Sequence, residues 1–125
     1  MSTRCNIVVR DGDSELWFYR HCDGYPESVL PDLEPLMEKL RDGSLRDNLS
    51  QFCGWLIVKG HEGYKRHSGF DDWKVGNYEP TTGLQVDVEY VYEFDLRLHT
   101  LKCLSWGSPA FDKLYEEMEG ETDEQ

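Results

Sequence analysis

Basic residues are scarce in this chain relative to acidic ones. Its 125 residues contain 13 Lys and Arg against 25 Asp and Glu, a formal net charge of −12 at pH 7. A strongly negative protein repels the phosphates of nucleic acids and the headgroups of anionic membranes, so we expect neither as a direct partner. The charge favours a basic protein surface as partner, including one that normally holds nucleic acid, although acidity also simply keeps a protein soluble.

Long apolar runs, export signals and paired cysteines are missing too. No apolar run approaches the roughly 18 residues of a membrane-spanning helix, and residues 1–15 lack the apolar core of a signal peptide. The four cysteines, Cys5, Cys22, Cys53 and Cys103, are widely spaced and form no C-x-x-C pair. We therefore expect free thiols and a cytoplasmic protein.

Catalytic signatures are also missing. The sequence has neither a nucleophile elbow nor a glycine-rich phosphate loop. His21 and Cys22 are neighbours, and neighbours on a strand point to opposite faces, so they do not form a base and nucleophile pair. His61 and His67 have no paired cysteines to complete a zinc site. We favour a non-enzymatic protein and expect no catalytic residue, cofactor or metal.

Aromatic residues, by contrast, are plentiful. The 4 Trp, 7 Tyr and 5 Phe supply large side chains for a core, which disordered chains lack. A length of 125 residues fits one domain. We predict a single domain over residues 1–118, followed by an acidic, disordered tail over residues 119–125.

Turn signals and periodicity divide the first half of the chain into elements. Asp11-Gly12-Asp13 separates two alternating segments and predicts a β-hairpin. An i, i+3, i+4, i+7 stripe of apolar residues around Leu33 predicts a helix, with Pro31 and Pro35 at its entry. The expected elements are strands 5–10 and 15–21, this helix up to Asp42-Gly43, a short helix 45–52, a buried strand 54–59, and a long loop 60–83 in which 73–78 could form a strand.

The clearest alternation lies in residues 86–96. Apolar side chains at the even positions alternate with acids, which predicts a strand with one face in water. Residues 101–106 are expected to return as its hairpin partner, and Ser108 with Pro109 to begin a last helix. This order predicts an α+β fold: a largely antiparallel sheet of about five to six strands built from hairpins, with about two to three helices mainly on one face and the acidic face open.

Several runs of residues resemble those of a family of small uncharacterised proteins found in bacteria and their phages. The matching runs are Ser2-Thr3-Arg4-Cys5-Asn6-Ile7, Leu16-Trp17-Phe18-Tyr19-Arg20-His21 with Asp23-Gly24-Tyr25-Pro26, Arg46-Asp47-Asn48, Gly54-Trp55-Leu56-Ile57, Trp73-Lys74-Val75-Gly76 with Tyr78-Glu79-Pro80-Thr81-Thr82, and Glu89-Tyr90. They are spread over most of residues 2–106. The resemblance implies an accessory gene of a phage or mobile element and implies no catalytic activity.

One group of polar residues suggests an anion-binding corner. Arg20 and His21 come at the end of a strand, and Arg46 and Asn48 offer a guanidinium and a neutral donor. Trp73 and Tyr78 in the long loop could stack on a base, so this site would take an anionic, nucleotide-like small molecule. The alternative is that each arginine pairs with an acid, Asp23 and Asp47 being nearest in sequence.

A second group of residues suggests a protein-binding surface. The acids Asp87, Glu89, Glu93 and Asp95 follow one another along the predicted strand at about 6.6 to 7 Å per two residues, close to the spacing of nucleic-acid phosphates. Any strand with one solvent-exposed face has the same spacing, so the alternative to a binding surface is an ordinary solvated face. We favour an acidic interaction protein that modulates a host protein, as an inhibitor or counter-defence factor, over the small-molecule site. A homodimer through a sheet edge remains open.

Overall fold

The computed structural model describes residues 3–21, 23–68, 78–84, 87–114 and 116, and the side chains of all these except 63–68. The elements are β1 (Cys5–Asp11), β2 (Ser14–Arg20), α1 (Pro26–Arg41), α2 (Leu49–Ser68), β3 (Glu79–Thr81), β4 (Tyr90–Asp95) and β5 (Thr100–Ser105). A short helix over residues 109–114 follows β5. The predicted tail 119–125 and most of the possible strand 73–78 lie outside the described residues.

A single sheet of five strands, in the order β3-β2-β1-β4-β5, organises the molecule. The hairpins β1–β2 and β4–β5 are antiparallel, as is the β2–β3 pair, whereas β1 and β4 run parallel to each other in the centre. The predicted α+β class with a mostly antiparallel sheet is confirmed. A parallel pair requires a crossover connection, and here the chain between β2 and β4 supplies it with both long helices.

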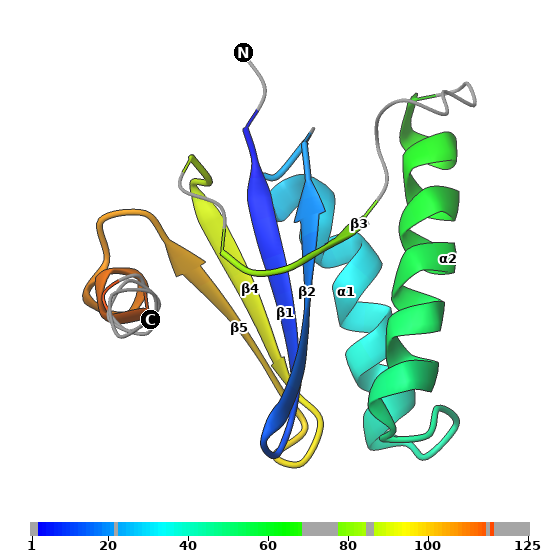
Figure 1. The fold of residues 1–125 in the computed structure, drawn as a ribbon. Coiled ribbons are helices and arrows are strands. Elements are labelled where there is room, and N and C mark those ends of the chain that lie inside the picture. The colour runs from blue at the N-terminus through cyan, green and yellow to red at the C-terminus, as the bar shows by residue number, and fades with distance from the viewer. Residues whose placement is uncertain (1–2, 22, 69–77, 85–86, 115, 117–125) are drawn as a thin grey trace.

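Helices α1 and α2 cover one face of the sheet, and the C-terminal helix covers part of the other (Figure 1). The main core lies under α1 and α2 and includes Ile7, Val9, Phe18, Leu33, Leu36, Phe52, Leu56, Tyr92 and Phe94. Alternation along β1 explains why this strand belongs to two cores: Ile7 and Val9 face α1 and α2, while Val8 faces the opposite side. The helices therefore lie mainly on one face, as predicted.

The second, smaller core changes the prediction of an open acidic face. Phe111 and Leu114 of the C-terminal helix pack with Trp17, Val8 and Val91. Ser108 begins this helix as predicted, because its Oγ accepts the amide of residue 111 at 3.3 Å. The helix thus covers part of the sheet face that carries the predicted acidic row.

The prediction that Pro31 and Pro35 mark the start of a helix is wrong. Helix α1 begins at Pro26, and both other prolines lie inside it. They are exposed and four residues apart, so both lie on the solvent side of the helix, where carbonyl groups left without a partner reach water. The predicted stop is confirmed, since Asp42 caps the helix and Gly43 follows with a φ of 84°.

The predicted strand 54–59 is wrong, because α2 runs through it from Leu49 to Ser68 and so also takes up the first part of the predicted loop 60–83. Of the predicted short helix 45–52, residues 49–52 form the first turn of α2 and residues 45–48 are not helical. Cys53, Leu56 and Gly60 lie buried on one side of this helix, while Trp55 is partly exposed. Gly60 is required by packing: a Cβ at this position would lie 1.9 Å from the ring of Tyr78. In the described part of the chain no helix is long and apolar enough to cross a membrane.

Candidate functional site

The side chain of Arg20, at the end of β2, is buried rather than exposed to solvent. Its Nη1 donates to Asp32 Oδ2 of α1 at 3.0 Å and to the Tyr78 hydroxyl at 2.7 Å. The Tyr78 hydroxyl donates to Asp32 Oδ2 at 3.0 Å, and all three side chains are buried. Burial raises the pKa of Tyr78 well above its usual value, so the hydroxyl keeps the proton it donates. These three residues, the Arg20 cluster, tie β2 to α1 and to the segment before β3.

Arg46 and Asn48 lie in the connection between α1 and α2. Asn48 caps α2, because its Oδ1 accepts the Gln51 amide at 3.0 Å, and Arg46 Nε donates to Gln51 Oε1 at 3.1 Å. Helix α1 has 16 residues and is therefore about 24 Å long. The connection consequently lies at the opposite end of the sheet from Arg20 (Figure 1).

The structure does not bring the predicted anion-binding residues together. His21 is exposed, and its Nδ1 lies 2.9 Å from the Tyr19 hydroxyl. Tyr78 is enclosed in the core, and Trp73 lies outside the described residues. The alternative interpretation, an arginine paired with an acid, is confirmed for Arg20, although the partner is Asp32 and neither of the acids nearest in sequence.

The predicted acidic row is interrupted by contacts within the chain. Asp87 pairs with Arg4 at 2.6 Å, and Glu93 pairs with Arg10 at 3.4 Å. Asp95 Oδ1 accepts two backbone amides of the β4–β5 turn at 2.9 and 3.0 Å. Strand β4 begins only at residue 90, so the first two acids precede it rather than lie along it. The row is therefore not one continuous surface.

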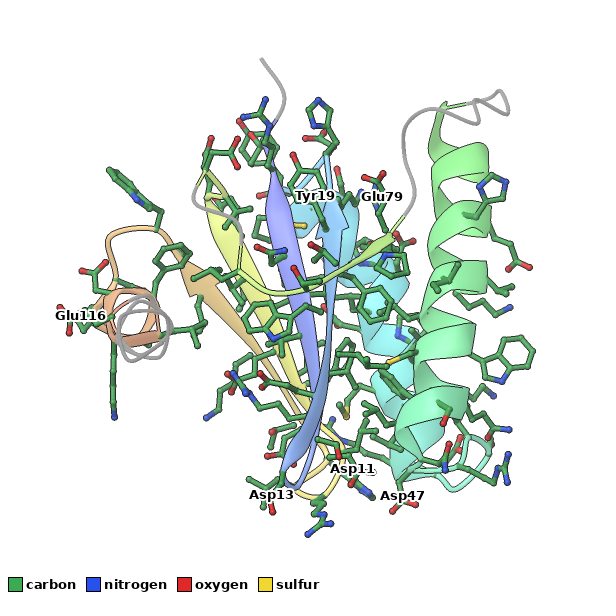
Figure 2. The ribbon with its side chains drawn as sticks, in the orientation of Figure 1. Asp11, Asp13, Tyr19, Asp47, Glu79 and Glu116 are labelled. Atoms are coloured by element: carbon green, nitrogen blue, oxygen red, sulfur yellow. The ribbon has the colours of Figure 1, made fainter. Side chains whose placement is uncertain are left out.

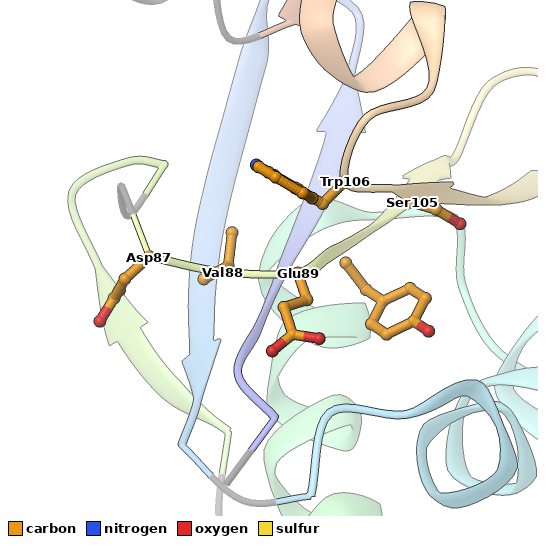
Figure 3. A pocket seen from close by; sticks show the side chains of 6 residues that line it. Asp87, Val88, Glu89, Ser105 and Trp106 are labelled. Atoms are coloured by element: carbon orange, nitrogen blue, oxygen red, sulfur yellow. The ribbon is translucent and has the colours of Figure 1, made fainter. Parts of the chain in front are cut away.

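A pocket opens where β4 begins and β5 ends. It has a volume of about 480 Å³, and Asp87, Glu89, Tyr90, Ser105 and Trp106 are among the residues that line it. Figure 3 shows Trp106 next to Ser105 at the end of β5, and Asp87 and Glu89 in the segment before β4; in this view the Trp106 indole and the Glu89 carboxylate point to opposite sides of that segment. Glu89 is exposed, and its carboxylate makes no hydrogen bond or ion pair within the described part of the chain. We call this the β4–β5 pocket.

Aromatic side chains accompany these carboxylates. Trp106 is 73% exposed, the largest exposed fraction among the large apolar side chains of the described residues. Tyr90 packs against Tyr25, with ring centroids 6.3 Å apart. Burial, and then the neighbouring Glu27, Cys103 and Glu89, raise the pKa of Tyr90. Carboxylates and aromatic rings thus line the same pocket, and both kinds of group attract cations.

Neither Trp106 nor Ser105 was predicted from the sequence as a site residue. Trp106 is the last residue of the predicted strand 101–106, whereas β5 ends at Ser105 and Trp106 precedes Gly107, whose φ is 85°. A tryptophan directly before a glycine at the end of a predicted strand was the available signal. Of the four acids predicted to bind a partner, the pocket brings together two, Asp87 and Glu89.

A second depression lies between α1 and β5. It has a volume of about 290 Å³. Leu30, Met37 and Leu101 form the apolar part of its lining, and Glu34, Glu38 and Arg41 of α1 supply two carboxylates and a guanidinium. We call it the α1–β5 groove. The described residues contain no group of three or more His, Cys, Asp or Glu side chains that could hold a metal ion.

Comparison with protein-family models, with curated proteins and with solved structures finds no match to this chain. The function is therefore inferred from the geometry of the two depressions and from the charge of the chain.

Proposed function

We propose that this chain is a non-enzymatic interaction protein that binds a basic segment of a partner protein at the β4–β5 pocket. The observation that carries this proposal is a pocket lined by both the exposed Trp106 and the carboxylate of Glu89. The motif resemblance described above supports a phage or mobile-element gene whose product modulates a host protein, as an inhibitor or counter-defence factor. The net charge of −12 supports a basic partner.

The chemistry of the pocket favours a guanidinium or ammonium group as the occupant. Glu89 provides a carboxylate acceptor, and Asp87 provides a second one that already holds Arg4. The indole of Trp106 offers the best aromatic face for a cation, worth about 0.5 to 1 kcal/mol at an exposed site. An anionic ligand would meet repulsion here, so the pocket does not suit the nucleotide-like alternative.

The test uses calorimetric titration with a basic probe, a peptide in which arginine and valine alternate over about eight residues, long enough to span a strand edge. The pocket variant combines Asp87→Asn and Glu89→Gln. Exposed ion pairs contribute up to about 1 kcal/mol each, so losing two should weaken binding by up to about thirtyfold. Trp106→Ala is expected to weaken binding about threefold through the lost cation–π contact.

A control variant separates the pocket from the overall charge. Asp13→Asn with Asp47→Asn changes the net charge equally, but both residues lie at the opposite end of the sheet (Figure 2). At physiological ionic strength screening acts over about 8 Å, so this variant should bind almost as wild type does. Equal weakening in both double variants, or no binding of the peptide to wild type, would contradict the proposal.

A further inference from the structure

Strand β5 forms one edge of the sheet. It has six residues, TLKCLS, and in the described part of the chain no strand pairs with its outer side. The Trp106 amide donates to the Glu89 carbonyl, which faces β4. Backbone groups alternate between the two sides of a strand, so those of Lys102 and Leu104 also face β4. Those of Leu101, Cys103 and Ser105 therefore point outward. The Ser105 carbonyl already accepts from the amide and the hydroxyl of Ser108, at 3.0 and 2.7 Å, so an added strand would use the three amides and the carbonyls of Leu101 and Cys103.

The two edges of the sheet differ in a way that singles out β5. At the other edge β3 has only three residues, and Pro80 removes the amide of the middle one. Short edge strands and prolines are the usual protection against pairing with another chain. Strand β5 contains no proline, glycine or acid, and Lys102 is its only charged residue. It spans about 20 Å of edge.

The surroundings of this edge favour a basic extended segment. The α1–β5 groove adjoins it, with Leu101 and Met37 in its lining, and its charged groups are the two carboxylates of Glu34 and Glu38 against the single guanidinium of Arg41. The β4–β5 pocket, with its own two carboxylates, lies where β5 ends at Ser105. A second copy of this chain would add its own net charge of −12 beside the same carboxylates, whereas a basic strand would meet complementary charge at the β4–β5 pocket and at Glu34 and Glu38 of the groove.

We propose that the partner binds as an added strand along β5, with alternate side chains entering the α1–β5 groove and a basic side chain reaching the β4–β5 pocket. This inference rests on the proposed function and adds the way in which the partner is held. Main-chain hydrogen bonds to residues 101, 103 and 105 supply affinity, and the two depressions select the side chains. The expected sequence is an extended segment with cationic and apolar residues in alternation.

The test uses the arginine–valine peptide and two N-methylated forms of it. One form carries methyl groups on the amides of every arginine, the other on those of every valine, so both keep the charge and all side chains. In an added strand only one of the two sets of amides faces β5. We therefore expect one methylated form to lose measurable binding and the other to bind as the parent does. Equal binding of both forms would overturn the added strand while leaving the proposed function intact.

Residue-resolved amide exchange by NMR gives an independent readout. In the free protein the amides of Leu101, Cys103 and Ser105 should exchange rapidly, while those of Lys102 and Leu104 are already protected by β4. The peptide should protect the outward set. An outward set that stays unprotected in the complex would refute the proposal. An outward set already protected in a free protein that runs as a dimer would assign the edge to a second copy instead.

Discussion

Replacing Tyr78 with Phe should test whether the Arg20 cluster stabilises the fold. The change keeps the ring against α2 but removes a hydroxyl that accepts from Arg20 at 2.7 Å and donates to Asp32 at 3.0 Å. Both partners are charged and buried, so the lost hydrogen bonds leave polar groups without water. We expect the free energy of unfolding to fall by about 2 kcal/mol.

Asp32→Asn should have a larger effect in the same cluster. It removes the charge that offsets the buried guanidinium of Arg20, and an uncompensated buried charge costs about 3 to 5 kcal/mol. A domain of this size has a total stability of about 5 to 15 kcal/mol, so the loss is a large fraction of it. The two substitutions share partners, so the double variant should be destabilised by less than the sum of the two single effects. We expect the shortfall from that sum to be about 0.5 to 3 kcal/mol.

Urea denaturation followed by tryptophan fluorescence measures these differences, with an unchanged denaturant slope showing that the variants unfold from the same native state. His21→Ala is the matched control, since His21 follows Arg20 directly but is exposed, and it should change stability by less than about 0.5 kcal/mol. If Tyr78→Phe and Asp32→Asn also stay within that limit, the cluster does not carry the stability that its burial implies.

Two further predictions concern α2 and the thiols. Gly60→Ala should destabilise the protein by about 1 to 3 kcal/mol, because the added Cβ overlaps a buried aromatic ring. Gly54→Ala should stabilise it by about 0.5 to 1 kcal/mol, because nothing lies within 4 Å of the added Cβ and alanine favours a helix. Thermal unfolding of both variants shows whether the two effects have opposite signs. Burial raises the pKa of Cys5 and of Cys53 to about 12 from 9.0, so the unfolded chain loses these protons first and stability should fall as the pH rises from about 9 to 12. Melting temperatures that stay constant over that range would contradict this, and maleimide labelling at neutral pH should modify the exposed Cys103 before either buried thiol.

The local elements that the sequence predicted well are those with complete signals. The β1–β2 hairpin follows from alternation around Gly12, which adopts a φ of 64° in the turn, and the helix stop follows from Gly43. The run Trp55 to Val58 was misassigned because a short apolar run fits a buried strand and a helix equally well. Only the packing of Leu56 and Gly60 against the rest of the core distinguishes the two.

The candidate site could be predicted only in part, because its residues come from separate segments. Asp87 and Glu89 were recognisable as acids, but their place beside Trp106 depends on how β4 pairs with β5. Arg20 and Arg46 looked like one site in the sequence, and the length of the helix between them places them at opposite ends of the sheet. Sequence spacing alone does not report such distances.

The sequence by itself determined the α+β class, the two hairpins, the acidic character and the positions of the turns, because these depend on composition and on contacts between near neighbours. The tertiary structure decided which charges are buried, that Arg20 pairs with Asp32, and that β5 becomes a sheet edge flanked by two depressions. Those features depend on contacts between segments far apart in the chain, and the energy of burying a charge or pairing a strand is set only when those segments meet.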